Sequence, residues 1–482
     1  MALLLIAQSH HFQPILRKPF LCSVKRTPHI SQLCKPQDSQ TLTETLPPDD
    51  RLIVVGGSKL HGHVNISGAK NSALAVLAGT LCCSRASKLH NIPDISDTRE
   101  MFSLLQSLGV QIEASNGEVT VDTEGILSVE PCPDSVRKTR GGFFVIGPLL
   151  ARFGEAVVAL PGGCDIGTRP IDLYIRGLQT LGAVVELRDN KVFAFAVNGR
   201  GLVGGKFHLD YPSVGATETL MMAASMADGV TILSNVAQEP EVVDLAWFLK
   251  KSGACVEGVG SDTLVIKGRN QLHGPEFTII PDRIEAGTFM VAAAITRSCV
   301  SMSPVIPHHL SSLIDKLSAS GCKIRESTQN TMEVSALLSD IAGDIRCVDV
   351  KTGPFPQFPT DLQPQIMALL LTCNGSSIVE ESVFDKRMGH VKELQKLGGR
   401  IQVCGNTALV NGKDQGSALY GTPVVATDLR GGAALILAGI AAEGATQING
   451  VAHIDRGYEN LDMKLCGIGA NIRRLSPPVC KA

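Results

Sequence analysis

The sequence predicts an α/β fold built from six copies of one βαβαββ-type unit, with apolar helices enclosed by sheets. Two observations support this prediction. A helical stretch, a glycine and an alternating strand follow one another six times along the chain, and a second helix that is apolar on every side accompanies each copy. A repeat of this kind constrains the architecture more strongly than the propensity of any single segment.

The repeated segment is recognised by its glycine. Typical copies are LQTLGAVVEL, which ends at Leu187, and LKKSGACVEG, which ends at Gly258. The aligned glycines are Gly109, Gly182, Gly253, Gly321, Gly398 and Gly469. Each one follows leucines at helical spacing and precedes a period-two alternation, so each is expected to end a helix and lead into a strand.

The second helix of each unit has no polar face. The six stretches are SALAVLAGTL from Ser72, FFVIGPLLA from Phe143, ATETLMMAASMA from Ala216, GTFMVAAAI from Gly287, QIMALLLT from Gln365 and AALILAGIAA from Ala433. A helix that is apolar all round must be surrounded by protein. These six are therefore expected in the interior, with the sheets outside them.

Length and composition exclude several classes of protein. A chain of 482 residues is too long for one ordinary core and favours two lobes. A net charge of -2, one Trp and four Tyr argue against a nucleic-acid partner. No apolar run is long enough to span a membrane, so no membrane partner is expected. The 14 Cys include no C-x-x-C pair, which indicates free thiols and no metal site.

The first fifty residues differ from the rest. No Asp or Glu occurs before Asp38, whereas five Lys or Arg are interspersed with Ser, Thr, Pro and His. This composition is typical of an organelle transit peptide, and a disordered tail is the alternative. We therefore expect residues 1–50 to be a transit peptide and the mature protein to lie in the plastid stroma.

Polar residues gather at the N-terminal ends of the six apolar helices. They are Lys70, Asn71, Arg140, Ser213, Arg283, Asp361, Asp428 and Arg430. Helix N-termini that converge on one cleft make an anion site, and phosphates are the obvious ligands. Ser213 and Asp428 are also suited to ordinary capping. Capping does not explain the cations, which oppose the helix dipole and need a negative partner.

Several segments then resemble a known family. They are GAKNSALAVLAG from Gly68, LPGGCDIGTRPIDL from Leu160, SVGATET from Ser213, PDRIEAGTF from Pro281, FPTDLQPQ from Phe358, ATDLRGGAALILAG from Ala426 and HIDRGYE from His453. Together they resemble the enolpyruvyl transferases that act on UDP-N-acetylglucosamine, within the EPSP synthase superfamily, in a plastid-type form. The resemblance implies an inside-out α/β barrel in two lobes. One lobe would span 70–281 and the other would join 51–69 to 282–482.

The glycine loop carries the most specific signal. Cys164 follows Pro161-Gly162-Gly163, which allow the backbone to move, and lies near Asp165 and Arg169. The resemblance implies that Cys164 protonates the methylene carbon of phosphoenolpyruvate and is the cysteine that fosfomycin alkylates. Cys82, Cys83, Cys255, Cys322 and Cys373 lie in apolar surroundings and are expected to be structural.

The resemblance also implies the substrate contacts. The predicted phosphoenolpyruvate site consists of Lys70, Asn71, Arg169, Arg387, Arg430 and Arg456, with Lys70 and Arg456 also counted as catalytic. Asp361 would be the base that takes the sugar hydroxyl proton, although Thr360-Asp361 before an apolar helix also suits an N-cap. No cofactor is expected.

The predicted UDP-N-acetylglucosamine site is larger. It consists of Arg140, Arg169, Pro170, Ile171, Asp172, Leu173, Tyr211, Pro212, Ser213, Val214, Asp361 and Val383. Tyr211-Pro212 and Gly141-Gly142 depart from the commoner family residues. Glu239 and Glu241 are interpreted as interlobe or surface carboxylates without a role.

Two alternatives remain open. A shikimate-type enolpyruvyl transferase shares the fold and the phosphoenolpyruvate chemistry, but it lacks the Pro-Gly-Gly-Cys loop. A catalytically silent relative that binds a nucleotide sugar is the other alternative, against which the intact Lys70, Cys164, Arg169, Asp361 and Arg456 argue.

Overall fold

The computed structural model describes residues 50–476, apart from 116, 198–200, 329, 338 and 340–342. The predicted transit peptide lies outside the described residues, except for Asp50. None of the described helices is long and apolar enough to cross a membrane.

Six inner helices form the interior, as predicted. They are α1 (Lys70–Gly79), α4 (Ile146–Phe153, preceded by the 3-10 turn η2, Arg140–Val145), α6 (Val214–Ala224), α8 (Arg283–Ile295), α10 (Gln363–Leu370) and α12 (Leu429–Ala441). Every residue of α8 after Arg283 is buried, and so is every residue of α12 up to Ile440. Their all-round apolar sequences are therefore explained by protein on every side.

Six further helices carry the repeated glycines. They are α2 (Ser96–Ser107), α5 (Asp172–Thr180), α7 (Pro240–Lys251), α9 (Ser311–Ser320), α11 (Val391–Lys396) and α14 (Leu461–Gly467). The glycine after each helix has a positive φ, from 84° at Gly182 to 111° at Gly321, and a strand begins one or two residues later. The predicted sequence of helix, glycine and strand is confirmed in all six units. Two shorter helices, α3 (Pro133–Lys138) and α13 (Val451–Asp455), lie outside this scheme.

The strands form six sheets in the described part of the chain. Three sheets have the strand orders β21 (Pro423–Val425), β22 (Ala445–Asn449), β1 (Arg51–Val55), β23 (Asn471–Leu475); β15 (Lys323–Thr328), β16 (Thr331–Ser335), β14 (Cys299–Ser303), β2 (His61–Asn65); and β17 (Val350–Lys351), β18 (Ser376–Glu380), β20 (Thr407–Asn411), β19 (Arg400–Cys404). The other three sheets have the orders β13 (Glu276–Thr278), β3 (Ser87–His90), β5 (Glu118–Asp122), β4 (Gln111–Ser115); β6 (Glu155–Ala159), β8 (Lys191–Ala196), β7 (Ala183–Arg188); and β11 (Cys255–Glu257), β12 (Thr263–Lys267), β10 (Val230–Ser234), β9 (Lys206–His208). Five of these sheets add one parallel pair to antiparallel pairs. The chain's first strand, β1, pairs with both β22 and β23 and so completes the last unit.

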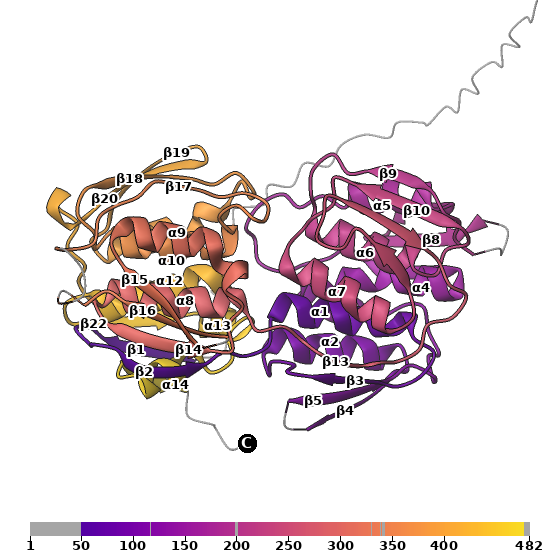
Figure 1. Cartoon of the computed structure of the whole chain (residues 1–482), viewed down its shortest axis with the longest axis horizontal. Helices are drawn as coiled ribbons and strands as arrows, with labels where there is room; N and C mark the ends of the chain where they lie inside the picture. Colours follow the sequence, from indigo (N-terminus) through magenta and orange to yellow (C-terminus); the bar gives the residue numbers. More distant parts are fainter. Residues whose placement is uncertain are drawn as a thin grey trace, which may run out of the picture. The chain divides into compact units, whose positions relative to one another are not determined.

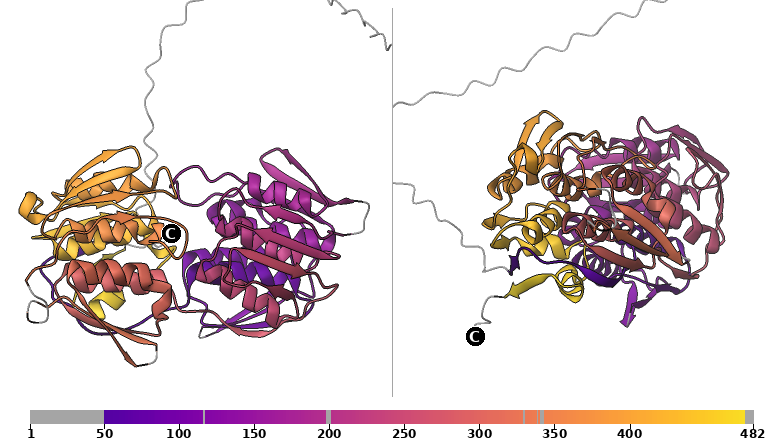
Figure 2. Two further views of the ribbon diagram at one scale, coloured as in Figure 1. Left: turned by 45° about the horizontal axis from the view of Figure 1, so that its top comes forward. Right: turned by 60° about the vertical axis from the view of Figure 1, so that its left-hand side comes forward.

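The buried apolar side chains form two clusters. The first cluster contains residues from Ala69 to Ile279, and the second contains Leu52 to Ile66 together with Ile284 to Ile472. Figures 1 and 2 show the inner helices of each cluster lying between layers of strands. The chain passes between the clusters where Gly68 and Pro281 form a β-bridge. The predicted domain limits, at 70 and 281, stay a prediction.

Candidate active site

The thiol of Cys164 lies among cations rather than in an apolar interior. The loop 160–171, between β6 and α5, carries Cys164, whose Sγ accepts a hydrogen bond from Arg456 Nη1 at 3.1 Å. On the same loop, Arg169 Nη2 donates to the carbonyl oxygen of Cys164 at 2.7 Å. The fold therefore brings the thiol of Cys164 close to two of the predicted phosphate ligands, Arg169 and Arg456.

His453 tunes this thiol and was not predicted. Burial raises the pKa of Cys164, but hydrogen bonding to His453 and the charge of Arg456 lower it below its usual value overall. The same hydrogen bond raises the pKa of His453. The interaction between the two side chains therefore favours the thiolate and the imidazolium. His453 and Arg456 are one helical turn apart in HIDRGYE, and this spacing was the available signal.

A single carboxylate holds two of the predicted phosphate ligands together. Asp97 Oδ2 lies 2.9 Å from Lys70 Nζ, and its Oδ1 accepts from Arg456 Nε at 2.9 Å. Asp97 is only 2% exposed. Burial raises the pKa of its carboxyl, but Lys70 and Arg456 lower it overall, so the group is ionised. Asp97 is the negative partner that Lys70 needs at the start of α1.

Arg140 and Arg169 have no such compensation. Arg140 Nη2 donates to the backbone oxygen of Arg169, and within the described ranges neither guanidinium forms an ion pair. Burial and the nearby Arg140 lower the pKa of Arg169. Two adjacent cations without a counter-charge attract an anion strongly, because the anion relieves their mutual repulsion.

Asp361 is held by two buried arginines. Its Oδ1 accepts from Arg387 Nη2 at 3.0 Å and its Oδ2 from Arg430 Nη2 at 3.1 Å. Burial raises the pKa of Asp361, but Arg430 and Arg387 hold it well below its usual range overall. The side chain of Asp361 is 25% exposed, whereas those of both arginines are 2% exposed. The carboxylate is thus partly accessible to a ligand, whereas the two arginines that hold it are buried.

One interpretation of this region needs revision. Asp361 lies within the 3-10 turn η5 (Thr360–Leu362), and no side chain caps that turn, so the N-cap alternative is wrong. Arg387 and Arg430 are both paired with Asp361, and their contact with phosphoenolpyruvate stays a prediction. Asp428 does cap α12, accepting from Arg430 N and Gly431 N, as expected.

Asn71 belongs to a buried polar group between the two clusters. Its Nδ2 donates to Glu241 Oε1 at 3.2 Å, and Arg283 pairs with Glu241 at 3.3 Å. Glu239 accepts from the backbone N–H of Phe355 at 3.1 Å. Of the two interpretations of Glu239 and Glu241, the interlobe one is confirmed and the surface one is wrong, because both carboxylates join elements of the first cluster to elements of the second.

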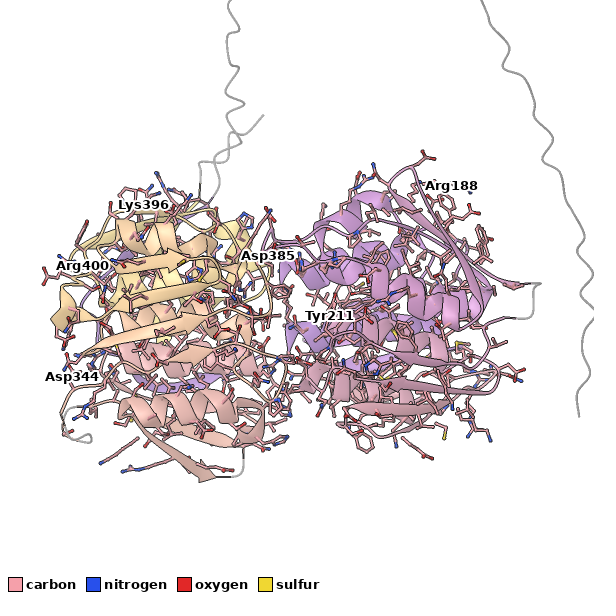
Figure 3. The ribbon with its side chains drawn as sticks, turned by 90° about the horizontal axis from the view of Figure 1, so that it is seen from above. Arg188, Tyr211, Asp344, Asp385, Lys396 and Arg400 are labelled. Atoms are coloured by element: carbon pink, nitrogen blue, oxygen red, sulfur yellow. The ribbon has the colours of Figure 1, made fainter. Side chains whose placement is uncertain are left out.

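The predicted nucleotide-sugar residues differ in what they can offer a ligand. Tyr211, labelled in Figure 3, is 46% exposed, and Val383 is 39% exposed. Ser213 caps α6 by accepting from Ala216 N, as its alternative interpretation expected. Leu173 is fully buried in the core, so its side chain offers no contact.

The remaining residues of the predicted nucleotide-sugar site lie at the end of the Cys164 loop and at the starts of α5 and α6. Pro170 and Ile171 end the loop, Asp172 begins α5, Pro212 precedes Ser213, and Val214 begins α6. The role of each in binding stays a prediction.

The Cys164 loop is docked on the segment 383–387. Thr168 N donates to Asp385 Oδ1 at 2.8 Å, and Lys386 N donates to the carbonyl of Ile166 at 3.1 Å. Asp385 is labelled in Figure 3. Gly167 is required here, because a Cβ at this position would lie 1.8 Å from Asp385 Oδ1. The loop belongs to the first cluster's part of the chain and the segment 383–387 to the second, so this contact joins the two clusters beside the thiol's loop.

The other cysteines behave mostly as predicted. Cys82, Cys83, Cys322 and Cys373 are buried, whereas Cys255 is only half-buried. Among the described residues, no group of three or more His, Cys, Asp or Glu is arranged to hold a metal ion.

Comparison with known proteins agrees with this geometry. Residues 54–465 match the family model described as EPSP synthase (3-phosphoshikimate 1-carboxyvinyltransferase). UDP-N-acetylglucosamine 1-carboxyvinyltransferase from Gloeobacter violaceus is 48% identical, covering 89% of this chain and 91% of the relative. The enzyme of that name from Synechocystis is 46% identical, covering 91% of this chain and 99% of the relative.

Solved structures give the same class. The enolpyruvyl transferase NikO from Streptomyces tendae matches with a TM-score of 0.80 and 27% identity, over 90% of this chain and all of that chain. EPSP synthase from Acinetobacter baumannii matches with a TM-score of 0.67 at 17% identity, over 89% of this chain, which shows the fold alone. A fold of six repeated units with a cation-lined thiol loop defines an enolpyruvyl transferase. The chain belongs to the EPSP synthase family.

Proposed function

We propose that this enzyme transfers the enolpyruvyl group of phosphoenolpyruvate to the 3'-hydroxyl of UDP-N-acetylglucosamine and releases phosphate, the first committed step of peptidoglycan precursor synthesis. The proposal rests mainly on one observation: the thiol of Cys164 accepts a hydrogen bond from Arg456, and Asp97 pairs with both Arg456 and Lys70. Relatives at 46 to 48% identity carry the name of this activity.

The first step is an addition. The sugar oxygen bonds to C2 of phosphoenolpyruvate while the C2=C3 π bond breaks, Cys164 gives its proton to C3, and Asp361 takes the hydroxyl proton. Asp361 is a weak base because of its two arginines, but the hydroxyl proton becomes acidic as the new C–O bond forms. Lys70, Arg169 and Arg456 balance the charge of the phosphate.

The second step is an elimination. The Cys164 thiolate takes a proton back from the C3 methyl, the C2=C3 bond forms again, and the C2–O bond to phosphate breaks. Phosphate leaves with the electron pair and with the proton that Asp361 received, so the protons balance over the cycle. His453 and Arg456 stabilise the thiolate between the two steps.

The nucleotide sugar is placed by Arg140 together with Arg169, which belongs to both predicted substrate sites. Arg140 and Arg169, which have no carboxylate partner within the described ranges, are suited to the diphosphate. Tyr211 and Val383 are exposed enough to contact the uridine or the sugar. The proposal needs no cofactor.

The test is phosphate release by the full chain. With phosphoenolpyruvate and UDP-N-acetylglucosamine we expect stoichiometric phosphate, and with shikimate 3-phosphate none. Release with shikimate 3-phosphate alone would establish the shikimate-type alternative. Binding of the nucleotide sugar without any release would establish the silent relative.

We also propose that residues 1–50 direct the protein to the plastid stroma. The absence of acidic residues before Asp38 supports this, and cyanobacterial relatives such as that of Synechocystis are compatible with it. A fluorescent protein fused behind residues 1–50 should enter plastids, and a cytosolic signal would contradict the proposal.

A further inference from the structure

A hydrogen-bonded network around Tyr458 joins the inner helices α8 and α10 of the second cluster to the segment after α13. Thr288 of α8 and Gln365 of α10 are fully buried, and Tyr458, which follows α13, is 3% exposed. Tyr458 Oη lies 3.1 Å from Thr288 Oγ1, and Gln365 Nε2 donates to Tyr458 Oη at 3.0 Å. The three side chains therefore meet at one phenol oxygen.

The directions of these hydrogen bonds follow from the available protons. Thr288 Oγ1 donates its only proton to the carbonyl of Ile284 at 2.8 Å, so it must accept from Tyr458. Tyr458 therefore donates to Thr288 and accepts from Gln365. Because the phenol oxygen donates one hydrogen bond and accepts another, the ring cannot rotate or shift without breaking a buried hydrogen bond.

The ring of Tyr458 supports Arg430. The guanidinium carbon of Arg430 lies 5.1 Å from the ring centroid, within the range of a cation–π contact. Arg430 donates through Nη2 to Asp361 at 3.1 Å, whereas its Nε and Nη1 make no hydrogen bond to a described residue. The guanidinium is thus held between one carboxylate oxygen and one aromatic face.

We propose that Tyr458 is a positioning residue that fixes Arg430, and through Arg430 the carboxylate of Asp361. This inference rests on the proposed function, in which Asp361 accepts the sugar hydroxyl proton. Arg387 holds the other oxygen of Asp361 independently, at 3.0 Å. Loss of the hydrogen-bonded network around Tyr458 should therefore misalign Asp361 without releasing it.

Tyr458→Phe tests this most directly, because it keeps the ring and removes both hydrogen bonds. We expect kcat to fall about tenfold while the KM for each substrate changes less than about twofold, as for an interaction used mainly in the chemical step.

Two companion variants separate positioning from folding. Thr288→Val removes the hydroxyl that accepts from Tyr458 and from Gln365, and it should lower kcat with little change in KM, whereas Thr288→Ser keeps a hydroxyl and should keep the wild-type kcat. Tyr420→Phe, at a site that is 52% exposed, is the matched control and should change neither kcat nor KM.

The inference is overturned if Tyr458→Phe keeps the wild-type kcat, if it raises KM as much as it lowers kcat, or if it only lowers the melting temperature. A wild-type enzyme that releases no phosphate would instead overturn the proposed function and this inference with it.

Discussion

The guanidinium of Arg456 and the carboxylate of Asp97 lie 2.9 Å apart although 359 residues separate them in the chain. Asp97 lies in the first turn of the first cluster's helix α2, and Arg456 follows α13 of the second. Arg456 also donates to the backbone of Lys138 at 3.0 Å and to Cys164 Sγ at 3.1 Å. One arginine therefore joins the two clusters and the thiol.

Replacing Asp97 tests this arrangement. In Asp97→Asn, Lys70 and Arg456 lose a shared buried counter-charge, so we expect kcat/KM for phosphoenolpyruvate to fall about tenfold to a hundredfold. The free energy of unfolding at pH 7 should fall by about 3 kcal/mol, as for a broken buried ion pair. Phosphate-release kinetics and urea denaturation measure these effects.

The pH dependence of this stability has a defined sign. The pKa of Asp97 is lowered in the folded protein, so the stability that the pair contributes is present above an unfolded pKa of about 3.9 and is lost as pH falls further. The gap between wild type and variant should therefore narrow below about pH 4. Asp94→Asn is the control, because its carboxylate pairs with Arg99 at the surface and should change stability by less than about 1 kcal/mol. Equal losses in both variants would contradict the role of Asp97.

His453→Gln should make Cys164 less acidic. His453 lowers the pKa of the thiol, so its removal raises that pKa and leaves less thiolate at neutral pH. The rate at which iodoacetamide alkylates Cys164 can be followed on its peptide by mass spectrometry. The increase of this rate with pH should occur at a higher pH in His453→Gln than in wild type. His208→Gln, which removes an exposed histidine paired with Ser234, is the control. Superimposable pH curves for wild type and His453→Gln would refute the coupling.

Gly162→Ala should displace the Cys164 loop. A Cβ at residue 162 would lie 1.7 Å from the carbonyl oxygen of Arg137, so the loop cannot keep its docked path. We expect kcat to fall at least tenfold and proteolytic cleavage within 160–171 to become faster. Gly467→Ala is the matched control, because a Cβ there meets no atom within 4 Å. Normal turnover in Gly162→Ala would show that the docked loop is dispensable.

Fosfomycin should add its mass at Cys164 alone. Cys132, Cys404 and Cys466 are more exposed, so accessibility by itself would favour them. The phosphonate of fosfomycin is an anion, and Cys164 is the thiol that contacts Arg456. Peptide mapping after treatment locates the adduct, and modification of another cysteine in preference would contradict the charge argument.

The repeated features could be predicted from the sequence because each depends on local physics. The six glycines with positive φ mark helix ends, and the apolar inner helices are defined by their own composition. The need for negative partners at Lys70 and Arg430 followed from the helix dipole, and Asp97 and Asp361 meet it.

The partners themselves could not be predicted, because they come from distant parts of the chain. Asp97 looks like an ordinary acid in the first turn of α2, and nothing local shows that it faces Lys70. The burial of Arg387 and Arg430 beside Asp361 likewise depends on how η5, α12 and the 383–387 segment meet. Tyr458 and His453 both belong to the segment HIDRGYE, but only the folded structure shows which side chains they contact.

The origin of the proton on C3 decides whether Cys164 acts as proposed. In deuterated water the thiol carries deuterium, so a single turnover of phosphoenolpyruvate and UDP-N-acetylglucosamine should leave deuterium in the methylene group of the product. Cys164→Ala should form almost no product under the same conditions. A product without deuterium, or a Cys164→Ala enzyme with wild-type turnover, would contradict the proposed role of the thiol.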